Sequence, residues 1–312
     1  MNTICSTCIR SYFLRIALFL FVFSGTVNAQ QTYSVENYSR IMWNHLEMLS
    51  ELGPRYVGTK GYGKTLQLIR HVGAEFADKV VEHPFVVKQH DGRQRQMVNI
   101  EFIFHGEKED QPVLLGTHFD TRPYADQESD PTLQNHPITG SNDGGSGTSV
   151  LLGLAQYLKE YPVSQPIRIM FFDGEDFGQS GTGEMFLGSK HHANFLRQNF
   201  QRTWPLAVII VDMVGDKDLE IFKETNSLAS GPKVLDRIYN VARRINIFQF
   251  NEKSKYTIQD DHLPFARLGI PSVVLIDFDY PYWHKLSDTL NKCSPKSLSA
   301  VFSVLVRVLS EW

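Results

Sequence analysis

The sequence predicts an α/β fold with a single domain, in which an open, twisted, mostly parallel mixed sheet is flanked by helices. From residue 112 onward, short apolar runs alternate with segments of helical apolar spacing. Such alternation is typical of parallel strands joined by crossover helices. The runs are rich in β-branched and apolar residues, as expected for strands that are buried on both faces. No internal repeat or linker divides residues 30–312, so we expect one domain.

The predicted elements follow one another in a simple order. Residues 33–52 and 61–76 have helical apolar spacing, and residues 80–87 and 96–104 resemble paired strands. The alternating part is expected to hold strands at 112–116, 167–172, 206–211 and 272–276, and helices at 146–161, 188–200, 232–247 and 295–309. Residues 124–140 are rich in Asp, Gln, Asn and Pro, which predicts a loop over the carboxyl edge of the sheet.

The first 29 residues differ from the rest of the chain. Arg10 and Arg15 are their only charges, residues 16–23 form an apolar run, and small residues follow at 27–29. This pattern predicts a cleaved signal peptide over residues 1–29 and an exported protein, periplasmic or secreted. An uncleaved membrane anchor is the alternative, although the apolar run is short for a membrane span.

Composition and charge limit the classes of partner. The 312 residues are 42% hydrophobic and 21% charged, which is ordinary for a globular protein. Cys5 and Cys8 lie in the predicted signal, so only Cys293 remains and disulfides are not expected to stabilise the domain. The formal charge of −3 becomes −5 without the signal's two arginines. We therefore expect no nucleic-acid partner, and no membrane partner beyond a possible uncleaved anchor.

Acidic and imidazole side chains follow the ends of several predicted strands. In an open α/β sheet, ligands bind outside the carboxyl ends of the strands, where loops direct side chains at one small volume. The residues in question are His118, Asp120, Asp143, Glu175, Asp176 and Asp212, followed by Gln259-Asp260-Asp261-His262 and Trp283-His284. Their order predicts one site at this edge.

These residue types suit zinc, which binds imidazole nitrogen and carboxylate oxygen and keeps one position open in catalytic sites. Asp143, Asp176 and His284 would supply three ligands. Glu175, adjacent to a ligand, is placed to act as a general base. His118 and Asp212 could complete a second metal site, with Asp120 orienting the imidazole of His118.

Each motif also has an ordinary structural explanation. The sequence around Asp143 could form a simple turn, and Glu175-Asp176 could be a solvated loop. Asp260 and Asp261 could cap the turn or helix that follows them. His191 and His192 are expected on the exposed part of a helix, and His105 and His136 are expected on the surface.

Taken together, the motifs resemble the zinc-dependent exopeptidase superfamily, which includes di-zinc aminopeptidases and animal-type glutaminyl-peptide cyclotransferases. The resemblance extends over nearly all of residues 30–312. Four segments are most similar to bacterial members of the cyclotransferase branch: HFDTRPYAD at 118–126, EDFG at 175–178, QDDHLP at 259–264 and YWH at 282–284. The Gln259–His262 segment is the most specific of them.

The resemblance implies that the protein converts the N-terminal glutamine of peptides or proteins to pyroglutamate and releases ammonia. It implies one zinc ion, with a second at His118 and Asp212 left open. The implied catalytic residues are Glu175, Asp212 and Asp260, the substrate-binding residues are Trp283 and Gln259, and the metal ligands are Asp143, Asp176 and His284.

Two features depart from the animal enzymes. Asp176 stands where those enzymes carry Glu, and no tryptophan occurs in residues 177–188, where they place a pocket aromatic. Two other functions remain open. A di-zinc aminopeptidase could use the same ligands, although the Gln259–His262 segment argues against it, and a non-catalytic binding protein could share the fold.

Overall fold

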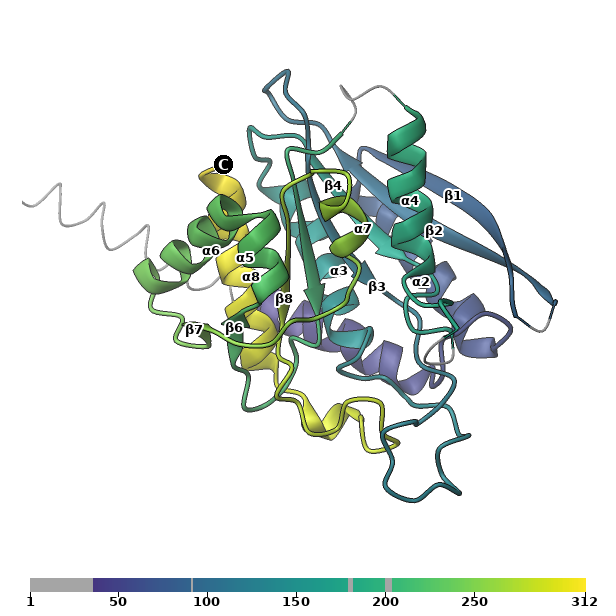
Figure 1. Cartoon of the computed structure of the whole chain (residues 1–312). Helices are drawn as coiled ribbons and strands as arrows, with labels where there is room; N and C mark the ends of the chain where they lie inside the picture. Colours follow the sequence, from purple (N-terminus) through teal and green to yellow (C-terminus); the bar gives the residue numbers. More distant parts are fainter. Residues whose placement is uncertain (1–35, 91, 179–181, 200–203) are drawn as a thin grey trace, which may run out of the picture.

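A computed structural model of the chain describes residues 36–90, 92–178, 182–199 and 204–312; the predicted signal peptide lies outside them. The centre of the fold is a six-stranded mixed sheet (Figure 1). Across the sheet the strands are β1 (Lys79–Lys88), β2 (Gln94–Phe104), β4 (Ile167–Phe172), β3 (Val113–His118), β5 (Ala207–Asp212) and β8 (Ser272–Ile276). The last four are parallel, and β2 is antiparallel to both neighbours. The predicted fold class is confirmed.

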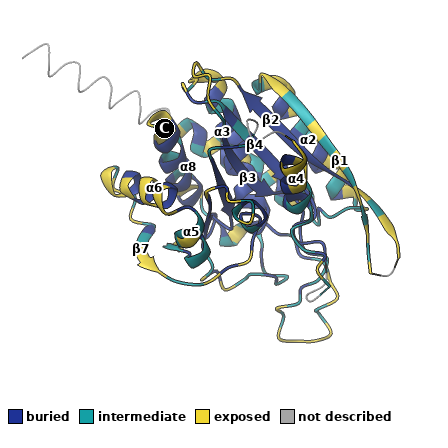
Figure 2. Ribbon diagram, turned by 45° about the horizontal axis from the view of Figure 1, so that its top comes forward, coloured by how far each residue is buried: buried dark blue, intermediate teal, exposed yellow. Residues whose placement is uncertain are grey.

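Helices cover both faces of this sheet. One face packs against the helix at residues 36–51 and against α2 (Lys60–Phe76), α3 (Gly145–Glu160), α6 (Pro232–Arg244) and α8 (Pro295–Ser310). The other face packs against α4 (Leu187–Gln198) and the short α7 (Leu263–Ala266). Figure 2 shows the central strands buried, while exposed residues appear on the outer helices and on β1. Two apolar cores therefore hold the sheet between helical layers.

Local sequence accounts for these elements. Every residue of β5 is buried, which explains its apolar run, whereas β1 alternates because only one of its faces is partly covered. Thr59 caps α2 through a bond from the backbone N–H of Tyr62, and Ser294 caps α8 ahead of Pro295. Each helix and strand that the pattern predicts is present.

The pattern missed several short elements beyond β5. They are β6 (Ile221–Lys223), α5 (Thr225–Ser230), β7 (Phe250–Ser254), α7 and a 3₁₀ turn at Leu290–Lys292. β6 and β7 pair with each other in a small parallel sheet. These segments are too short, and β7 too polar and exposed, to show a hydrophobic period.

The prediction that His191 and His192 both lie on an exposed helix surface is wrong for His192. That side chain is buried where α4 packs against the sheet, and its ring lies 5.1 Å from the ring of His83 in β1. His191 is partly exposed and stacks on Phe85. His105 and His136 are exposed, as predicted.

Among the described residues, no helix combines the length and the apolar character that a membrane span requires.

Candidate metal centre and active site

The predicted site residues meet at the carboxyl edge of the sheet. His118 ends β3, Asp212 ends β5, and Glu175 and Asp176 follow β4 within four residues. β4 and β5 lie on opposite sides of β3, so the chain changes direction across the sheet at this point. Such a switch point is where open α/β sheets form their binding crevices.

The loop before α3 places Asp143 beside His118. Gly144 has a φ of 73°, and a Cβ there would lie 2.4 Å from the carbonyl oxygen of Asp120. Only glycine fits this position without displacing backbone. The buried carboxylate of Asp288 accepts the backbone N–H groups of Asn142 and Asp143 at 2.9 and 3.1 Å. The position of Asp143 is therefore fixed from both sides.

Asp143, Asp176 and His284 form the group that the sequence predicts as zinc ligands. His284 Nε2 lies 3.2 Å from Asp176 Oδ1 and 3.6 Å from Asp143 Oδ2. Ligand atoms of a tetrahedral zinc, about 2.0–2.1 Å from the metal, lie about 3.3 Å from each other. Asp143 Oδ2 and Asp176 Oδ2 are buried and have no hydrogen-bond partner among the described residues. Spacing, donor chemistry and unsatisfied oxygens all fit a zinc ion.

A second group shares Asp143 and adds His118 and Asp212. His118 Nε2 lies 3.1 Å from Asp212 Oδ1 and 3.2 Å from Asp143 Oδ1. These distances suit hydrogen bonds from a protonated nitrogen. They also suit the separation between two ligand atoms of a second metal ion. The geometry is thus compatible with one or two metal ions.

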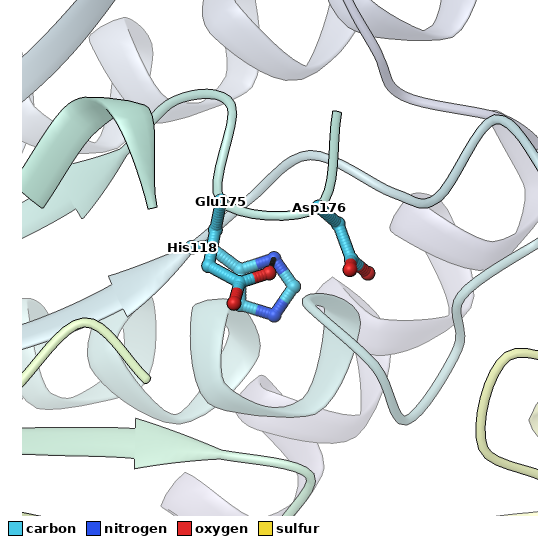
Figure 3. A group of neighbouring side chains, drawn as sticks. All are labelled: His118, Glu175 and Asp176. Atoms are coloured by element: carbon cyan, nitrogen blue, oxygen red, sulfur yellow. Dashed lines mark ion pairs between the residues drawn. The ribbon is translucent and has the colours of Figure 1, made fainter. Parts of the chain in front are cut away.

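Glu175 projects toward the same volume from the loop after β4. Figure 3 shows its carboxylate close to the ring of His118, with Asp176 beside them. Glu175 Oε2 lies 4.0 Å from His118 Nδ1. The backbone N–H groups of Glu175 and Asp176 donate to the two carboxylate oxygens of Asp120, at 3.1 and 3.2 Å. Asp120 therefore fixes the Glu175–Asp176 loop, and its 3.5 Å separation from His118 Nδ1 is too long for a strong hydrogen bond.

His284 is held in place by a carboxylate on its other nitrogen. Its Nδ1 contacts Asp126 Oδ1 at 2.9 Å, and the guanidinium of Arg122 donates to both oxygens of Asp126. Arg122 also donates to the carbonyl oxygens of Asp176 and Gly178. A proton on Nδ1 leaves Nε2 as the atom that faces the metal group. His284 adopts a φ of 53°, an uncommon conformation for a non-glycine residue.

The site concentrates negative charge away from water. Burial and the neighbouring Asp176 raise the pKa of Glu175 well above its usual value, and raise that of Asp143 to about 7. Burial and Asp212 likewise raise the pKa of Asp260. Burial would also raise the pKa of Asp176, but His284 and Arg122 hold it below its usual range. Carboxylates so crowded cannot all ionise cheaply, and a divalent cation would relieve their repulsion.

The Gln259–His262 segment borders the same site and is partly buried and partly exposed. Asp260 and Asp261 are buried, whereas Gln259 is exposed. The residue that caps α7 is His262, without a side-chain cap bond, so neither aspartate caps that helix. Asp261 instead accepts a hydrogen bond from Ser189 Oγ in α4. The negative charge of Asp212 contributes to the raised pKa of Asp260, so these two acids lie near each other.

Trp283 forms an aromatic wall beside the metal group. Its ring centroid lies 4.1 Å from that of His284 and 5.1 Å from that of Phe278, and the Phe278 ring in turn contacts Tyr256 at 5.4 Å. All three aromatic residues are partly exposed. A half-buried aromatic surface next to the metal group can receive an apolar part of a substrate.

The sequence analysis assigned no role to three residues that position the site. They are Arg122 and Asp126, which act on His284, and Asp288, which fixes Asp143. Arg122 and Asp126 lie four residues apart in a segment without a helical pattern, so nothing in their spacing indicates a pair. Asp288 accepts hydrogen bonds from backbone N–H groups. Nearly every residue carries such a group, so this contact leaves no pattern of residue types in the sequence.

Comparisons with known proteins agree with this geometry. The family model described as Peptidase family M28 matches residues 99–309. A glutaminyl-peptide cyclotransferase-like protein of Bos taurus is 23% identical over 224 residues, a match that covers 64% of this chain and 57% of that relative. The glutaminyl cyclase of Fimbriiglobus ruber is similar in structure, with a TM-score of 0.82 and 28% identity over 88% of this chain and 95% of the other. A leucine aminopeptidase precursor from Bacteroides thetaiotaomicron also has a TM-score of 0.82, with 25% identity over 88% and 97%.

Proposed function

The chain belongs to peptidase family M28, and we propose that within this family it is a zinc-dependent glutaminyl-peptide cyclotransferase. It would convert the N-terminal glutamine of peptides or proteins to pyroglutamate and release ammonia. The observation that carries this proposal is the buried Asp260, which lies near Asp212 at the edge of the metal groups that involve Asp212 and Glu175. A hydrolase of this fold needs metal ligands and a base, but has no evident use for an additional buried acid.

In this proposal Asp143, Asp176 and His284 hold one zinc ion. When bound, zinc supplies a Lewis acid that polarises the γ-carboxamide of the substrate glutamine. The reaction is intramolecular, so the protein must mainly orient the α-amine toward the γ-carbonyl carbon. Trp283 and Gln259 would contact the substrate on the open side of the site.

Glu175 would move the proton that the reaction displaces. It accepts a proton from the α-amine as that nitrogen bonds to the γ-carbonyl carbon. It then returns the proton to the amide nitrogen, which leaves as ammonia when its bond to carbon breaks. The raised pKa of Glu175 supports this role, because an acid–base group works best when its pKa lies near the working pH.

Asp212 and Asp260 would form an acidic pair that holds the cyclising substrate. Burial and the nearby Asp212 raise the pKa of Asp260, so Asp260 retains a proton more readily than an aspartic acid in water and would share it with Asp212. A shared proton can donate a hydrogen bond to the developing charge on the substrate. This role requires a carboxyl group at both positions.

A di-zinc aminopeptidase is the second candidate. The group of His118, Asp143 and Asp212 has the spacing of a second metal site, and the similar leucine aminopeptidase precursor supports this alternative. In that case His118, Asp143 and Asp212 would hold the second ion, and Glu175 would act as the base toward the attacking water. The cyclotransferase is favoured because the Gln259–His262 segment, which argues against an aminopeptidase, places the buried Asp260 near Asp212.

Two substrates separate these functions. Purified protein is incubated with a glutamine-initiated dipeptide and, separately, with a leucine-based aminopeptidase substrate, and its metal content is measured. Ammonia release from the dipeptide without peptide cleavage supports the cyclotransferase. Hydrolysis of the leucine substrate supports the peptidase, and the absence of both activities supports a non-catalytic binding protein.

We further propose that the protein is exported after removal of residues 1–29. The support is the pattern of two early arginines, an apolar run at 16–23 and small residues at 27–29. Sequencing the N-terminus of the protein recovered outside the cytoplasm should give a chain that begins near Gln30. A chain that keeps residues 1–29 would contradict cleavage.

A further inference from the structure

A second polar pocket lies at the other end of the parallel strands from the metal group. Its volume is about 320 Å³, and its lining includes Leu114 near the start of β3, Arg168 in β4 and the C-terminal half of α4. In Figure 1, α4 lies beside β1 and β2, with which it is in contact. His118 follows Leu114 by four residues, which is about 13 Å along a strand. The pocket is therefore separate from the metal centre.

The charged side chains of this pocket carry an excess of positive charge. Glu101 is buried, and its carboxylate contacts Arg168 Nη1 and His83 Nε2, each at 2.9 Å. Lys79 also lines the pocket and forms no ion pair with any residue that the structure describes. Lys79 and Arg168 each carry one positive charge against one negative charge on Glu101. Lys79 is exposed, so its ammonium is in water when no ligand is bound and is accessible to an anion.

His192 adds a buried polar atom with no partner. Its side chain lines the pocket and is 3% exposed, and among the described residues nothing accepts from or donates to its Nδ1. Burial lowers the pKa of His192 to about 3, so the imidazole is neutral at neutral pH. A buried polar group without a partner costs about 1–3 kcal/mol. A ligand that bonds to it would recover part of this cost.

The remaining walls of the pocket are apolar. Val81 and Ile103 come from β1 and β2, and Phe195 and Leu196 come from α4. Phe195 is 42% exposed, so its ring is accessible to a ligand in the pocket. The pocket thus combines a cationic region with an aromatic and aliphatic surface, as small-molecule sites commonly do.

We infer that this pocket binds a small organic monoanion, in which a carboxylate group is attached to an apolar or aromatic body. The carboxylate would pair with Lys79 and Arg168, and the apolar body would pack against Phe195. The single excess positive charge matches a monoanion better than a phosphate dianion. The volume is near the lower end of the roughly 300–1,000 Å³ typical of ligand sites, which suits a molecule the size of an N-acylated amino acid.

The test uses N-acetylphenylalanine as the probe and N-acetylphenylalaninamide as its uncharged match. Neither has a free amine or an N-terminal glutamine, so neither can be cyclised. Binding to the zinc-loaded protein is measured by isothermal titration calorimetry. We expect the carboxylate to bind at least about tenfold more tightly than the amide, since one charge-assisted contact contributes about that much.

Variants locate the binding. Lys79→Gln and Arg168→Gln should each raise the Kd for N-acetylphenylalanine about tenfold and leave the turnover of a glutamine-initiated peptide unchanged. Lys88→Gln, at the other end of β1, should change neither and is the matched control. Because Arg168→Gln also weakens a buried ion pair, Phe195→Ser provides a second surface variant that should weaken binding without affecting the fold.

Several results would overturn the inference. Equal affinity for the carboxylate and the amide would remove the role of charge. An unchanged Kd in Lys79→Gln and Phe195→Ser would place the probe elsewhere, and loss of binding in His284→Ala would place it on the zinc. Tighter binding of inorganic phosphate than of N-acetylphenylalanine would contradict an organic monoanion.

Discussion

Replacement of Asp126 by asparagine should weaken zinc binding although Asp126 is not itself a ligand. Asp126 Oδ1 contacts His284 Nδ1 at 2.9 Å, and both oxygens of Asp126 accept from Arg122. His284 Nδ1–H and the Arg122 guanidinium are both donors. The amide group of asparagine would therefore face one of these donors, whichever way it is turned. One contact in the chain from Arg122 through Asp126 to His284 therefore becomes repulsive.

The expected fall in zinc affinity follows from the orienting role of Asp126. The variant keeps the shape of the side chain and all three ligands, but the charged chain that fixes the orientation and tautomer of His284 is broken at one of its two contacts. Loss of such a partner typically costs about 10–100-fold in metal affinity, or about 1.4–2.7 kcal/mol. Arg122 keeps its bonds to the carbonyl oxygens of Asp176 and Gly178, so the loop should stay folded.

Zinc affinity is measured by competition with a chromophoric chelator, and folding is checked by thermal unfolding of the metal-free protein. Asp130→Asn is the matched control, because Asp130 lies exposed in the same loop and its carboxylate bonds only locally to Thr132. His284→Ala should abolish tight binding altogether, which defines the lower limit of the assay. Zinc affinity of Asp126→Asn within twofold of the original protein would refute this reasoning.

Three further changes test the remaining roles. Glu175→Gln should keep zinc and fold but lower turnover of glutamine-initiated peptides about 10²-fold or more, because the amide cannot carry a proton; normal turnover would exclude Glu175 as the shuttle. Asp260→Asn should strongly reduce cyclisation at unchanged zinc content and melting temperature, whereas a merely structural aspartate would tolerate the change. Asp173→Asn tests the pH dependence of stability, since burial and the nearby Asp120 raise the pKa of Asp173 from 3.8 to about 8. The folded state keeps this proton up to about pH 8, while the unfolded chain loses it near pH 4. The stability from Asp173 is therefore complete below pH 4 and declines as the pH rises to about 8. The melting temperature of the original protein relative to Asp173→Asn should fall between pH 5 and pH 8, and parallel profiles would contradict this assignment.

The fold was largely predictable because its strands are buried on both faces. The apolar run of β5 and the spacing of α3 and α8 are direct consequences of burial, which leaves a pattern in the sequence. β6 and β7 gave no such signal because they are short and, apart from Ile221 and Phe250 in the main core, largely outside it. The burial of His192 was missed for a related reason, since the partners that surround its ring, His83 and Phe265, come from distant segments.

The candidate metal ligands could be predicted from the sequence, but the residues that hold those ligands in place could not. His118, Asp143 and Asp212 could be expected together because strand ends converge at one edge of the sheet. The contact of Asp126 with His284 joins positions 158 residues apart through a loop, and no hydrophobic period constrains that loop. Residues that orient ligands are set by tertiary contacts, which a single sequence does not reveal.

One peptide tests the central proposal most directly. The purified protein is loaded with zinc and incubated with a peptide that begins Gln-Leu, and the products are followed by mass spectrometry. Cyclisation predicts a single product that retains every residue and has lost one ammonia. Release of free glutamine, together with a peptide that begins at leucine, would contradict the proposal and assign this chain to the aminopeptidases.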